Sequence, residues 1–313
     1  MTQIITLDKI DTKILNELEL DSRQSNSNIA KKLKTNKAIV NYRIDRLEKR
    51  NIITKYQFIS DQTLLNEKSF GLLIQFEKMN LTQETKMIKN IEKIKKIAWV
   101  KSIIGTYDLI IVIIAKNIDE FNKTLEKIFE KTDNKISKYD FYIDYEGEIF
   151  NHNYLYPDYK IKEKIVKYGS KKIIELKNVE LDVLSELKKN PKASILEITS
   201  KLNKTYDTVK AKYNFLKEQN ILLKCSPKIN IELLGYTNWF CLFNIKPNKS
   251  AEEEFINFCN NNNNIVRYSK CLGQFNIIIN IHAKNSEELK KINYELRSKF
   301  SNSINAYELI QLS

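Results

Sequence analysis

The chain has 313 residues, more than one hydrophobic core usually serves, so two or more domains are expected. With 42% hydrophobic residues and only six Gly and four Pro, the composition excludes a largely disordered or collagen-like chain. A formal net charge of +13 favours a polyanionic partner, either nucleic acid or an acidic membrane surface, and charge alone does not choose between them.

The sequence shows neither an export signal nor a membrane span. Its first residues, MTQIITLDKID, lack a basic region followed by an apolar core, so a cytoplasmic protein is expected. The longest apolar run, Leu109–Ala115, is far shorter than the roughly 20 residues of a spanning helix and predicts a buried strand. Because Cys225, Cys241, Cys259 and Cys271 form no C-x-x-C pair, we expect reduced core thiols and no metal site.

The first half opens with three predicted helices, in which apolar residues return every three or four positions. They lie near Leu7–Leu20, Asn26–Leu33 and Asn36–Arg50. Asn26 and Asn36 are predicted N-caps, since a short side-chain acceptor can bind the free N–H groups of a first turn. Alternating residues at Ile52–Ile59 then predict a strand.

The third predicted helix is amphipathic and basic. It buries Val40, Ile44 and Leu47, which turns a polar face toward solvent. The surrounding stretch, Ile29–Ile53, holds eight Lys or Arg against two acids. Two short helices joined by a tight turn, the second with a basic face, are the arrangement that places a helix in the DNA major groove. The alternative is that these charges only solvate a helix surface, as most surface charges do.

A pattern of strand, helix, strand, strand, helix, strand follows. The strands are expected near Phe70–Lys78, Ala98–Ile104, Tyr107–Ala115 and Ile136–Tyr145, and the helices near Gln83–Lys96 and Asp119–Thr132. The middle hairpin should turn at Gly105, where glycine relieves an unusual backbone angle. This order predicts a ferredoxin-like unit, a four-stranded antiparallel sheet with two helices on one face.

The second half repeats the first. The segment from Leu7 aligns without a gap to the segment from Leu176, and GTYDLIIVIIAKN from Gly105 aligns to GQFNIIINIHAKN from Gly273. Its later strands are expected near Thr237–Lys246, Ile265–Leu272, Phe275–Ala283 and Ser303–Gln311. The predicted fold class is α+β, with two copies of a winged helix-turn-helix followed by a βαββαβ sandwich. The expected boundaries are 1–60 and 61–145 for the first copy, 146–172 for a linker, and 173–228 and 229–313 for the second copy.

Three spaced motifs carry a resemblance to a known family. LDKIDTKIL from Leu7, SNSNIAKKL from Ser25 and VNYRIDRLEKRNII from Val40 closely resemble the winged helix-turn-helix of the Lrp/AsnC regulators. VKSIIGTYDL from Val100 resembles the ligand-sensing RAM domain that follows it in that family. The resemblance implies a cytoplasmic transcriptional regulator that binds double-stranded DNA, pairs through its α+β domains and, in many members, binds an amino acid effector.

The sequence departs from the family pattern in two ways. Family members usually have Gly where Lys34 and Asn51 stand, and Lys34 is expected to give a differently shaped turn, because lysine rarely adopts a left-handed backbone. Family members are also single-copy chains that pair. One chain here is therefore expected to form an internal pseudo-dimer of its two halves, with further homo-oligomers left open and no membrane partner.

The predicted DNA contacts lie on the second and third helices of each copy. Phosphate contacts are assigned to Lys31, Lys32, Lys34, Arg46, Lys49 and Arg50, and base contacts to Lys37, Asn41 and Tyr42, with Asn36 beside them and Arg43 open to either role. The second copy offers Lys204, Tyr206, Lys210 and Lys212. Two alternatives stay open: Tyr42 as a partly buried spacer, and Asp207 as either a first-turn acid or an acceptor from cytosine.

The effector contacts implied by the resemblance are Gly105, Thr106, Tyr107 and Asp108, with Gly273 and Gln274 in the second copy. Backbone N–H groups would meet a carboxylate and Asp108 an ammonium group. Asn276 replaces Asp108 in the copy, so the second sensor is expected to have lost or altered its ligand. The alternative is that these residues serve the hairpin turn alone. No cofactor is predicted.

Two other functions compete with the regulator. Some proteins of similar domain plan are sirohaem decarboxylases, whose chemistry needs His, Arg or Tyr near the substrate carboxylates. This chain has only two histidines, His152 in the linker and His282 in an apolar strand, so we expect no enzyme. The other alternative is a sensing and interaction protein whose second DNA head has decayed.

Overall fold

The structure, a computed structural model, describes residues 4–133, 135–156, 166–246 and 248–312. The chain divides into two compact units, each taking segments from both halves of the sequence. The first unit combines Met1–Leu65, Asn151–Val166 and Lys172–Tyr236, and the second combines Asn66–Phe150, Lys167–Lys171 and Thr237–Ser313. Residues 157–165 of the predicted linker lie outside the described residues.

The first unit begins with a helical head, called head 1. It consists of α1 (Lys9–Leu20), α2 (Asn26–Lys32) and α3 (Lys37–Lys49), followed by β1 (Ile53–Ser60) and a 3-10 turn (Gln62–Leu65). Ile14, Leu18, Ile29, Val40 and Leu47 are buried between the helices. Because these residues recur at helical spacing, each helix turns one apolar face inward and leaves the opposite face wet.

The two predicted N-caps have different outcomes. Asn36 caps α3 as predicted, since its side-chain oxygen accepts a hydrogen bond from the Ile39 N–H at 2.8 Å. The prediction for Asn26 is wrong by one residue: Ser25 caps α2, and its hydroxyl accepts from the Asn28 N–H at 3.1 Å. Serine is an equally good cap, and the sequence offered both residues side by side.

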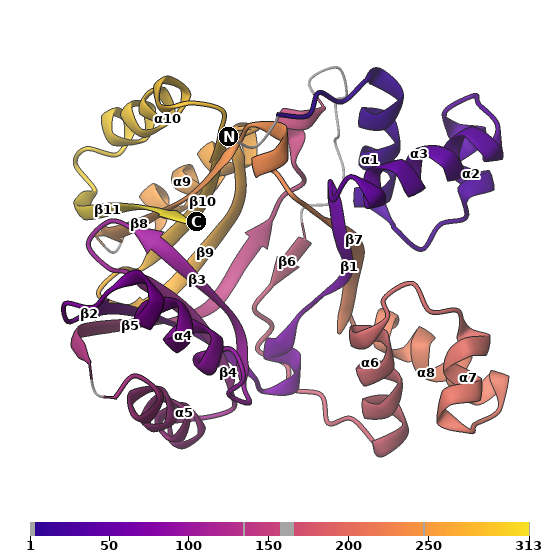
Figure 1. Cartoon of the computed structure of the whole chain (residues 1–313), viewed down its shortest axis with the longest axis horizontal. Coiled ribbons are helices and arrows are strands. Elements are labelled where there is room, and N and C mark those ends of the chain that lie inside the picture. The colour runs from indigo at the N-terminus through magenta and orange to yellow at the C-terminus, as the bar shows by residue number, and fades with distance from the viewer. Residues whose placement is uncertain (1–3, 134, 157–165, 247, 313) are drawn as a thin grey trace. The chain divides into compact units, whose positions relative to one another are not determined.

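The first unit also contains a second helical head, called head 2. It consists of α6 (Asn178–Lys189), α7 (Ile195–Leu202) and α8 (Tyr206–Glu218), followed by β7 (Leu222–Ile229) and a 3-10 turn (Glu232–Leu234). Strands β1 and β7 lie side by side and pair antiparallel, with Phe58 opposite Cys225 (Figure 1). The strand after each head therefore joins the two heads into one sheet.

The two heads also exchange core residues. Ile229 and Leu234 follow α8 in the chain but pack into the core of head 1. Leu64 follows β1 but packs into the core of head 2, with Phe58 against the same cluster. Since each core is completed by the other half of the chain, the two heads stabilise one another.

The second unit contains both predicted βαββαβ patterns. The first comprises β2 (Lys68–Phe76), α4 (Leu81–Ile91), β3 (Ile97–Ile104), β4 (Leu109–Ala115), α5 (Ile118–Lys131) and β5 (Ile136–Ile149). The second comprises β8 (Thr237–Ile245), α9 (Lys249–Asn261), β9 (Ile265–Gly273), β10 (Ile277–Ala283), α10 (Ser286–Lys299) and β11 (Ile304–Leu312). Each pattern forms an antiparallel sheet, in the orders β5-β2-β4-β3 and β11-β8-β10-β9, which confirms the ferredoxin-like prediction.

The predicted domain plan implied two separate sheets, but the structure joins them. Strand β3 pairs with β11 and β5 pairs with β9, so the strands form a closed ring within the described residues. β5 runs on to Ile149, through residues expected to be linker, because Glu146–Ile149 pairs with β9. A short strand, β6 (Val166–Tyr168), borders β5, and a 3-10 turn (Asn153–Leu155) belongs to the first unit.

Glycine allows the strands to meet where the two halves join. A Cβ at Gly273 would lie 2.7 Å from the Phe141 carbonyl oxygen, and a Cβ at Gly105 would lie 2.9 Å from Ile310 Cγ2. Both glycines also have positive φ angles, +145° and +155°. A side chain at Gly273 would push β9 from β5, whereas a side chain at Gly105 would displace the Ile310 side chain and strain the turn.

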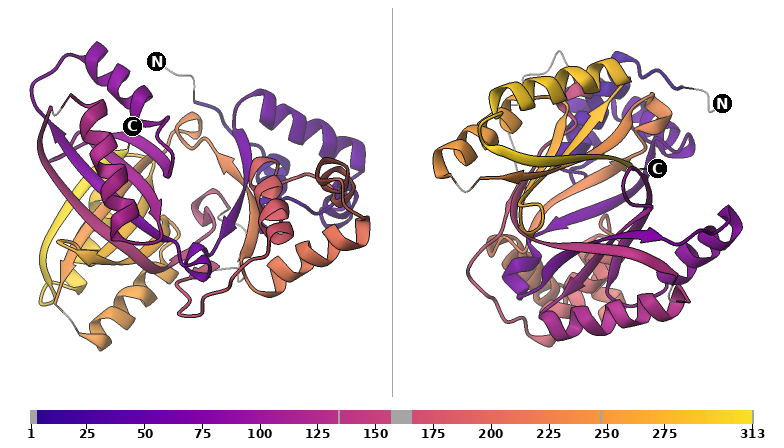
Figure 2. Two further views of the ribbon diagram at one scale, coloured as in Figure 1. Left: turned by 90° about the horizontal axis from the view of Figure 1, so that it is seen from below. Right: turned by 90° about the vertical axis from the view of Figure 1, so that its left-hand side faces the viewer.

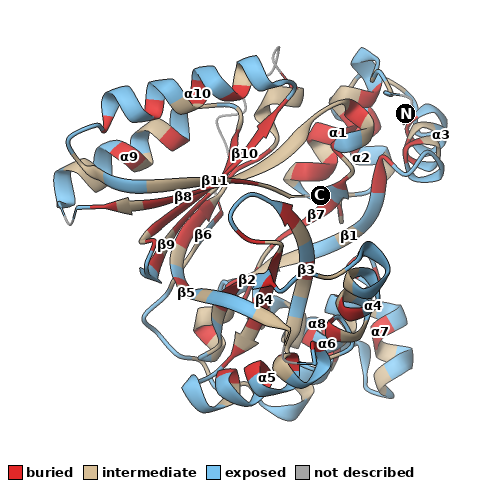
Figure 3. Ribbon diagram, turned by 60° about the vertical axis from the view of Figure 1, so that its left-hand side comes forward, coloured by how far each residue is buried: buried red, intermediate tan, exposed pale blue. Residues whose placement is uncertain are grey.

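The four long helices of the second unit lie on the outer face of the curved sheet (Figure 2). Their buried residues line the side that meets the sheet (Figure 3). The inner face holds a separate apolar cluster that includes Leu73, Tyr107, Ile110, Leu242 and Ile310. The four cysteines are buried and free, as predicted: Cys225, Cys241, Cys259 and Cys271.

Candidate nucleic-acid interface

Helix α3 presents an unburied polar face. Its apolar residues Val40, Ile44 and Leu47 point into head 1. The opposite side exposes residues of several chemical types, namely Lys37, Ala38, Ile39, Asn41, Tyr42 and Asp45. Tyr42 is 62% exposed, so the alternative of a partly buried spacer is wrong. A cationic nitrogen, an amide and an aromatic hydroxyl thus project from one rigid helix.

The predicted lysines of head 1 are exposed: Lys31, Lys32, Lys34, Lys37 and Lys49, with Arg50 beside them. Two of them form ion pairs, Lys32 with Glu17 at 2.6 Å and Lys49 with Asp45 at 2.8 Å. The Lys49–Asp45 pair is exposed and therefore weak, so the Lys49 ammonium group remains able to exchange partners. The Glu17 side chain is only 13% exposed, so Lys32 is held more firmly. The Asn36 side-chain oxygen is committed to its cap.

Arg43 and Arg46 are held inside head 1. Both guanidinium groups pair with Asp11, at 3.1 Å and 2.5 Å, and Arg43 also pairs with Asp8. Asp11 is buried, and Arg43 and Arg46 are partly buried. The buried carboxylate needs these cations, because an unpaired buried charge is costly. The structure therefore gives both arginines a structural partner where the sequence suggested DNA contacts.

Head 2 repeats this ion pair and differs on its outer face. Lys212 pairs with the buried Glu180 at 2.9 Å, as Arg43 pairs with Asp11 in head 1. Lys204, Tyr206 and Lys210 are exposed, as a DNA contact requires. Asp207 is also exposed and lies in the first turn of α8, which Thr205 caps.

The turn after α2 keeps the shape that glycine would give it. Lys34 has φ +51°, and Asn203, at the matching position in head 2, has φ +50°. Asn51 and Asn220, after α3 and α8, have φ +56° and +57°. The expectation of a differently shaped turn at Lys34 is wrong, since the lysine accepts the left-handed backbone.

The predicted effector turn divides into exposed and buried residues. Gly105, Thr106, Gly273 and Gln274 are exposed, whereas Tyr107 is buried and its hydroxyl lies 2.5 Å from Asp140. Burial, together with the hydrogen bond to Asp140, raises the pKa of Tyr107 to about 12.

Asp108, the acidic residue of the predicted effector turn, accepts a hydrogen bond from the backbone of a neighbouring strand. Asp108 Oδ2 accepts from the Phe76 N–H at 2.8 Å, and Asn276 Oδ1 accepts from the Ile245 N–H at the same distance. The exchange of Asp for Asn preserves this bond. This shared bond supports the alternative that Asp108 and Asn276 serve the hairpin turn.

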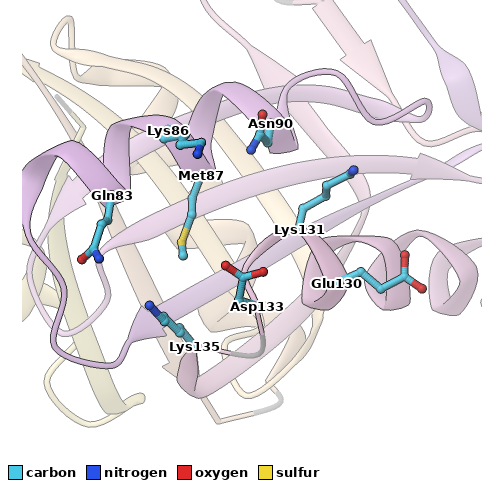
Figure 4. Close-up of a pocket in the computed structure, with 8 residues that line it drawn as sticks. All are labelled: Gln83, Lys86, Met87, Asn90, Glu130, Lys131, Asp133 and Lys135. Carbon is cyan, nitrogen blue, oxygen red and sulfur yellow. The ribbon is translucent and has the colours of Figure 1, made fainter.

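An open pocket of about 430 Å³ lies between α4 and α5 (Figure 4). Met87 forms its apolar floor, and Lys86, Lys131, Lys135 and Asp133 surround it. The predicted effector residues do not line it within the described part of the chain. We assign it no role.

Sequence reasoning missed a buried polar cluster under head 1. Glu19 on α1 accepts from the His152 backbone N–H at 3.1 Å, and its other oxygen lies 2.6 Å from the His152 ring Nδ1. Lys224 on β7 donates to Asn151 in the same cluster. A charged residue on the inner face of α1 was the available signal. His152 thus contacts a buried carboxylate of the fold.

The described residues include no helix long and apolar enough to cross a bilayer. Nor do they bring together His, Cys, Asp or Glu side chains suited to holding a metal ion.

Comparison with known proteins adds a family. The model of the winged helix-turn-helix DNA-binding family matches residues 7–54. The HTH-type transcriptional regulator LysM of Sulfurisphaera tokodaii is 34% identical over 122 residues, which are 39% of this chain and 84% of that protein. LysM of Saccharolobus solfataricus is 31% identical over 122 residues, 39% of this chain and 83% of that protein.

A solved structure matches nearly the whole chain. The sirohaem decarboxylase NirDL aligns with 97% of this chain and 91% of its own at a TM-score of 0.64, with 15% identity. At that identity the likeness shows the fold alone. The sequence relatives decide the family, because they are more than 30% identical and this chain covers 84% and 83% of their own length. The chain belongs to the Lrp/AsnC family of helix-turn-helix transcriptional regulators.

Proposed function

We propose that the protein regulates transcription by gripping double-stranded DNA with two unequal recognition helices, α3 and α8. The observation that carries the proposal is the exposed face of α3, where Lys37, Asn41 and Tyr42 stand on a helix whose other face is buried. An amide can read adenine and an ammonium group can read guanine in the major groove. The lysines around them would hold the phosphates.

One chain would supply both DNA-binding heads, which other family members supply from two chains. The pairing of β1 with β7 and the exchanged core residues support a two-headed unit in which the heads keep a fixed relation. Head 2 exposes Tyr206, Asp207 and Lys210 where head 1 exposes Lys37, Ala38 and Asn41. The two half-sites would therefore differ in sequence, unlike the palindrome that a symmetric dimer requires.

Mobility shifts at several salt concentrations test the proposal. Neutralising four to eight phosphates would give a slope of log affinity against log salt of about −4 to −7. Lys31→Ala should reduce the slope by about 1, and Asn41→Ala should weaken binding by about 1–3 kcal/mol and relax one base position. Asn122→Ala, on the exposed face of α5, is the matched control and should change neither.

Arg46→Met separates structure from DNA contact. It removes the pair with Asp11, so we expect a lower Tm but an unchanged salt slope. If Arg46→Met reduces the slope of log affinity against log salt as much as Lys31→Ala does, Arg46 contacts a phosphate after all. If the affinity of the unaltered chain did not change with salt concentration, the proposed phosphate contacts would be wrong.

The whole-chain likeness to NirDL keeps an enzyme as the second candidate. Sirohaem added to the full chain tests this candidate. The regulator proposal predicts no spectral shift, and a saturable shift would favour the decarboxylase.

A further inference from the structure

An open pocket of the first unit lies between β1 and the end of α6. Its volume is about 370 Å³, within the range of about 300–1,000 Å³ that is usual for binding sites. It is lined by Lys55, Tyr56, Gln57, Phe58, Lys188, Lys189, Asn190 and Pro191. Four of these residues come from each half of the chain, so the pairing of the two halves forms the pocket.

The internal repeat gives this pocket a counterpart in the same unit, called the twin site. Strand pairing sets the relation, because Gln57 lies opposite Ser226, its own counterpart in the repeat. The residues aligned to the pocket lining are Lys224, Cys225, Ser226, Pro227, Glu19, Leu20, Asp21 and Ser22. Six of these eight are buried, whereas only Pro191 is buried among the eight that line the pocket. The twin site is therefore covered where the pocket is open.

A segment of the chain itself covers the twin site. It consists of residues 151–156, which include the 3-10 turn after β5. His152 contacts the Glu19 carboxylate through its backbone N–H and through its ring. The Asn151 side-chain oxygen accepts from the Lys224 ammonium group. The covering segment thus supplies a partner for each charged group of the twin site.

The open pocket differs from its twin in charge. Lys188 stands where the twin site has Glu19, and Lys55 stands where it has Lys224. Both lysines are exposed, and within the described part of the chain neither forms an ion pair. The Lys192 ammonium adds a further positive charge, 4.3 Å from the Tyr56 ring centroid. An occupant of the pocket must therefore bring a negative charge where the segment at the twin site brings a histidine.

The pocket also lacks a backbone hydrogen bond that its twin has. In the twin site, the Ser22 N–H donates to the Cys225 carbonyl at 2.9 Å. Pro191 replaces Ser22 and has no N–H, so it cannot donate to the matching carbonyl of Tyr56. Pro191 is held in place by Arg23, whose Nη1 donates to the proline carbonyl at 2.6 Å. The Tyr56 carbonyl can therefore accept an N–H from an occupant.

We propose that the open pocket binds a short acidic peptide segment of a partner protein, at the place that residues 151–156 take in the twin site. A carboxylate of the segment would pair with Lys188, as His152 contacts Glu19. A carbonyl oxygen would accept from Lys55, as Asn151 accepts from Lys224, and a backbone N–H would donate to Tyr56. The occupant is a peptide because the twin site holds a turn of polypeptide and because a nucleic-acid backbone has no N–H donor.

Fluorescence anisotropy of labelled hexapeptides, measured with the full chain and without DNA, tests the proposal. The first peptide copies residues 151–156 with aspartate in place of histidine, Asn-Asp-Asn-Tyr-Leu-Tyr, and the reference peptide keeps the histidine. We expect saturable binding of the aspartate peptide, with a Kd of about 0.01–1 mM for so short a segment. The histidine peptide should bind at least about tenfold more weakly, because it brings no negative charge to the lysines.

Lys188→Glu tests the site itself. It gives the pocket the acid of the twin site, so the affinity for the aspartate peptide should fall at least about tenfold and that for the histidine peptide should rise. Since Lys188 is exposed, the Tm should stay the same. If the Tm falls, Lys188→Gln replaces it, with the same loss of aspartate-peptide binding expected. Lys290→Glu, at an exposed position of α10, makes the same charge change and should leave both affinities unaltered.

Three results would overturn the proposal: no saturable binding of the aspartate peptide, equal or tighter binding of the histidine peptide by the unaltered chain, or aspartate-peptide binding that Lys188→Glu and Lys188→Gln leave unchanged. DNA is the remaining alternative occupant. If Lys188→Gln reduces the slope of log DNA affinity against log salt by about 1, the pocket contacts a phosphate and the peptide proposal is wrong. Because DNA binding by the unaltered chain is measured separately, failure here leaves the regulator proposal standing.

Discussion

Lys34 occupies a backbone conformation that glycine prefers. Its φ of +51° costs an ordinary residue about 1–2 kcal/mol, while glycine would add about 0.5–1 kcal/mol of chain entropy to the unfolded state. We therefore expect Lys34→Gly to raise the free energy of unfolding by up to about 1 kcal/mol, measured by urea denaturation. Asn203→Gly, at φ +50° in head 2, should gain less, because asparagine tolerates this region better. A loss of stability for Lys34→Gly would contradict the account.

Glu19 predicts a pH dependence of head 1. Burial alone would raise its pKa, but the charge and hydrogen bonds of His152, with the charge of Lys224, outweigh burial and hold the pKa below 4.5. A carboxyl whose folded pKa lies below its unfolded value stabilises the fold above about pH 4.5, and this contribution is lost as the pH falls through the lowered pKa.

The variant Glu19→Gln measures this contribution. The difference in free energy of unfolding between the unaltered chain and Glu19→Gln should be largest near neutral pH and should shrink below pH 4.5. Chemical denaturation at several pH values gives this difference directly. A difference that stays constant into acid would mean that Glu19 is not the titrating group.

Periodicity identified the helices but not the partners of their charges. The spacing of Val40, Ile44 and Leu47 predicted the buried face of α3. The predicted ends of this helix lie within one residue of those in the structure. Arg43 and Arg46 resembled their exposed neighbours in sequence, and only the fold shows them against Asp11. A buried acid on another helix leaves no periodic signal that would link it to its cation.

The exchanged core residues make a prediction about the elements. Leu64 lies directly after β1, yet it packs with Val183, Leu187 and Leu216 of head 2. Leu64→Ala should cost about 2–5 kcal/mol, as Leu→Ala changes in cores do. Hydrogen exchange should speed up in α6, α7 and α8 while α1, α2 and α3 change little. Leu65, only partly buried, is the matched position, and its change to Ala should have a smaller effect.

The opposite pattern of exchange would contradict this assignment. If Leu64→Ala loosened α1 to α3 first, the core of head 2 would not depend on the first half of the chain.

The strand pairings show where sequence reasoning stops. Alternation placed β2, β4 and β10 to within about two residues, because each strand carries its own pattern. The closure of the ring depends on contacts such as Asp144 with Cys271, which lie far apart in the chain. Glu146–Ile149 contains a glycine and two acids and resembles a linker, so its place in β5 could not be predicted locally.

At the scale of the whole molecule, both units are built from both halves of the chain. The first unit joins two heads through β1 and β7, and the second joins two sheets into a ring. Covalent linkage frees the two halves to differ, since neither must pair with an identical copy. Head 1 and head 2 expose different residues on their recognition helices. The two halves of the ring likewise contribute different residues to its interior.

The most direct test is a hydroxyl-radical footprint on fragments selected from genomic DNA, with the protein-to-DNA ratio measured in the same complex. A chain with two unequal heads should bind as one copy per site and protect two half-sites of different sequence, separated by about one helical turn or a multiple of it. Two chains on one palindrome would contradict the two-headed chain. The absence of any protected site would contradict DNA binding itself.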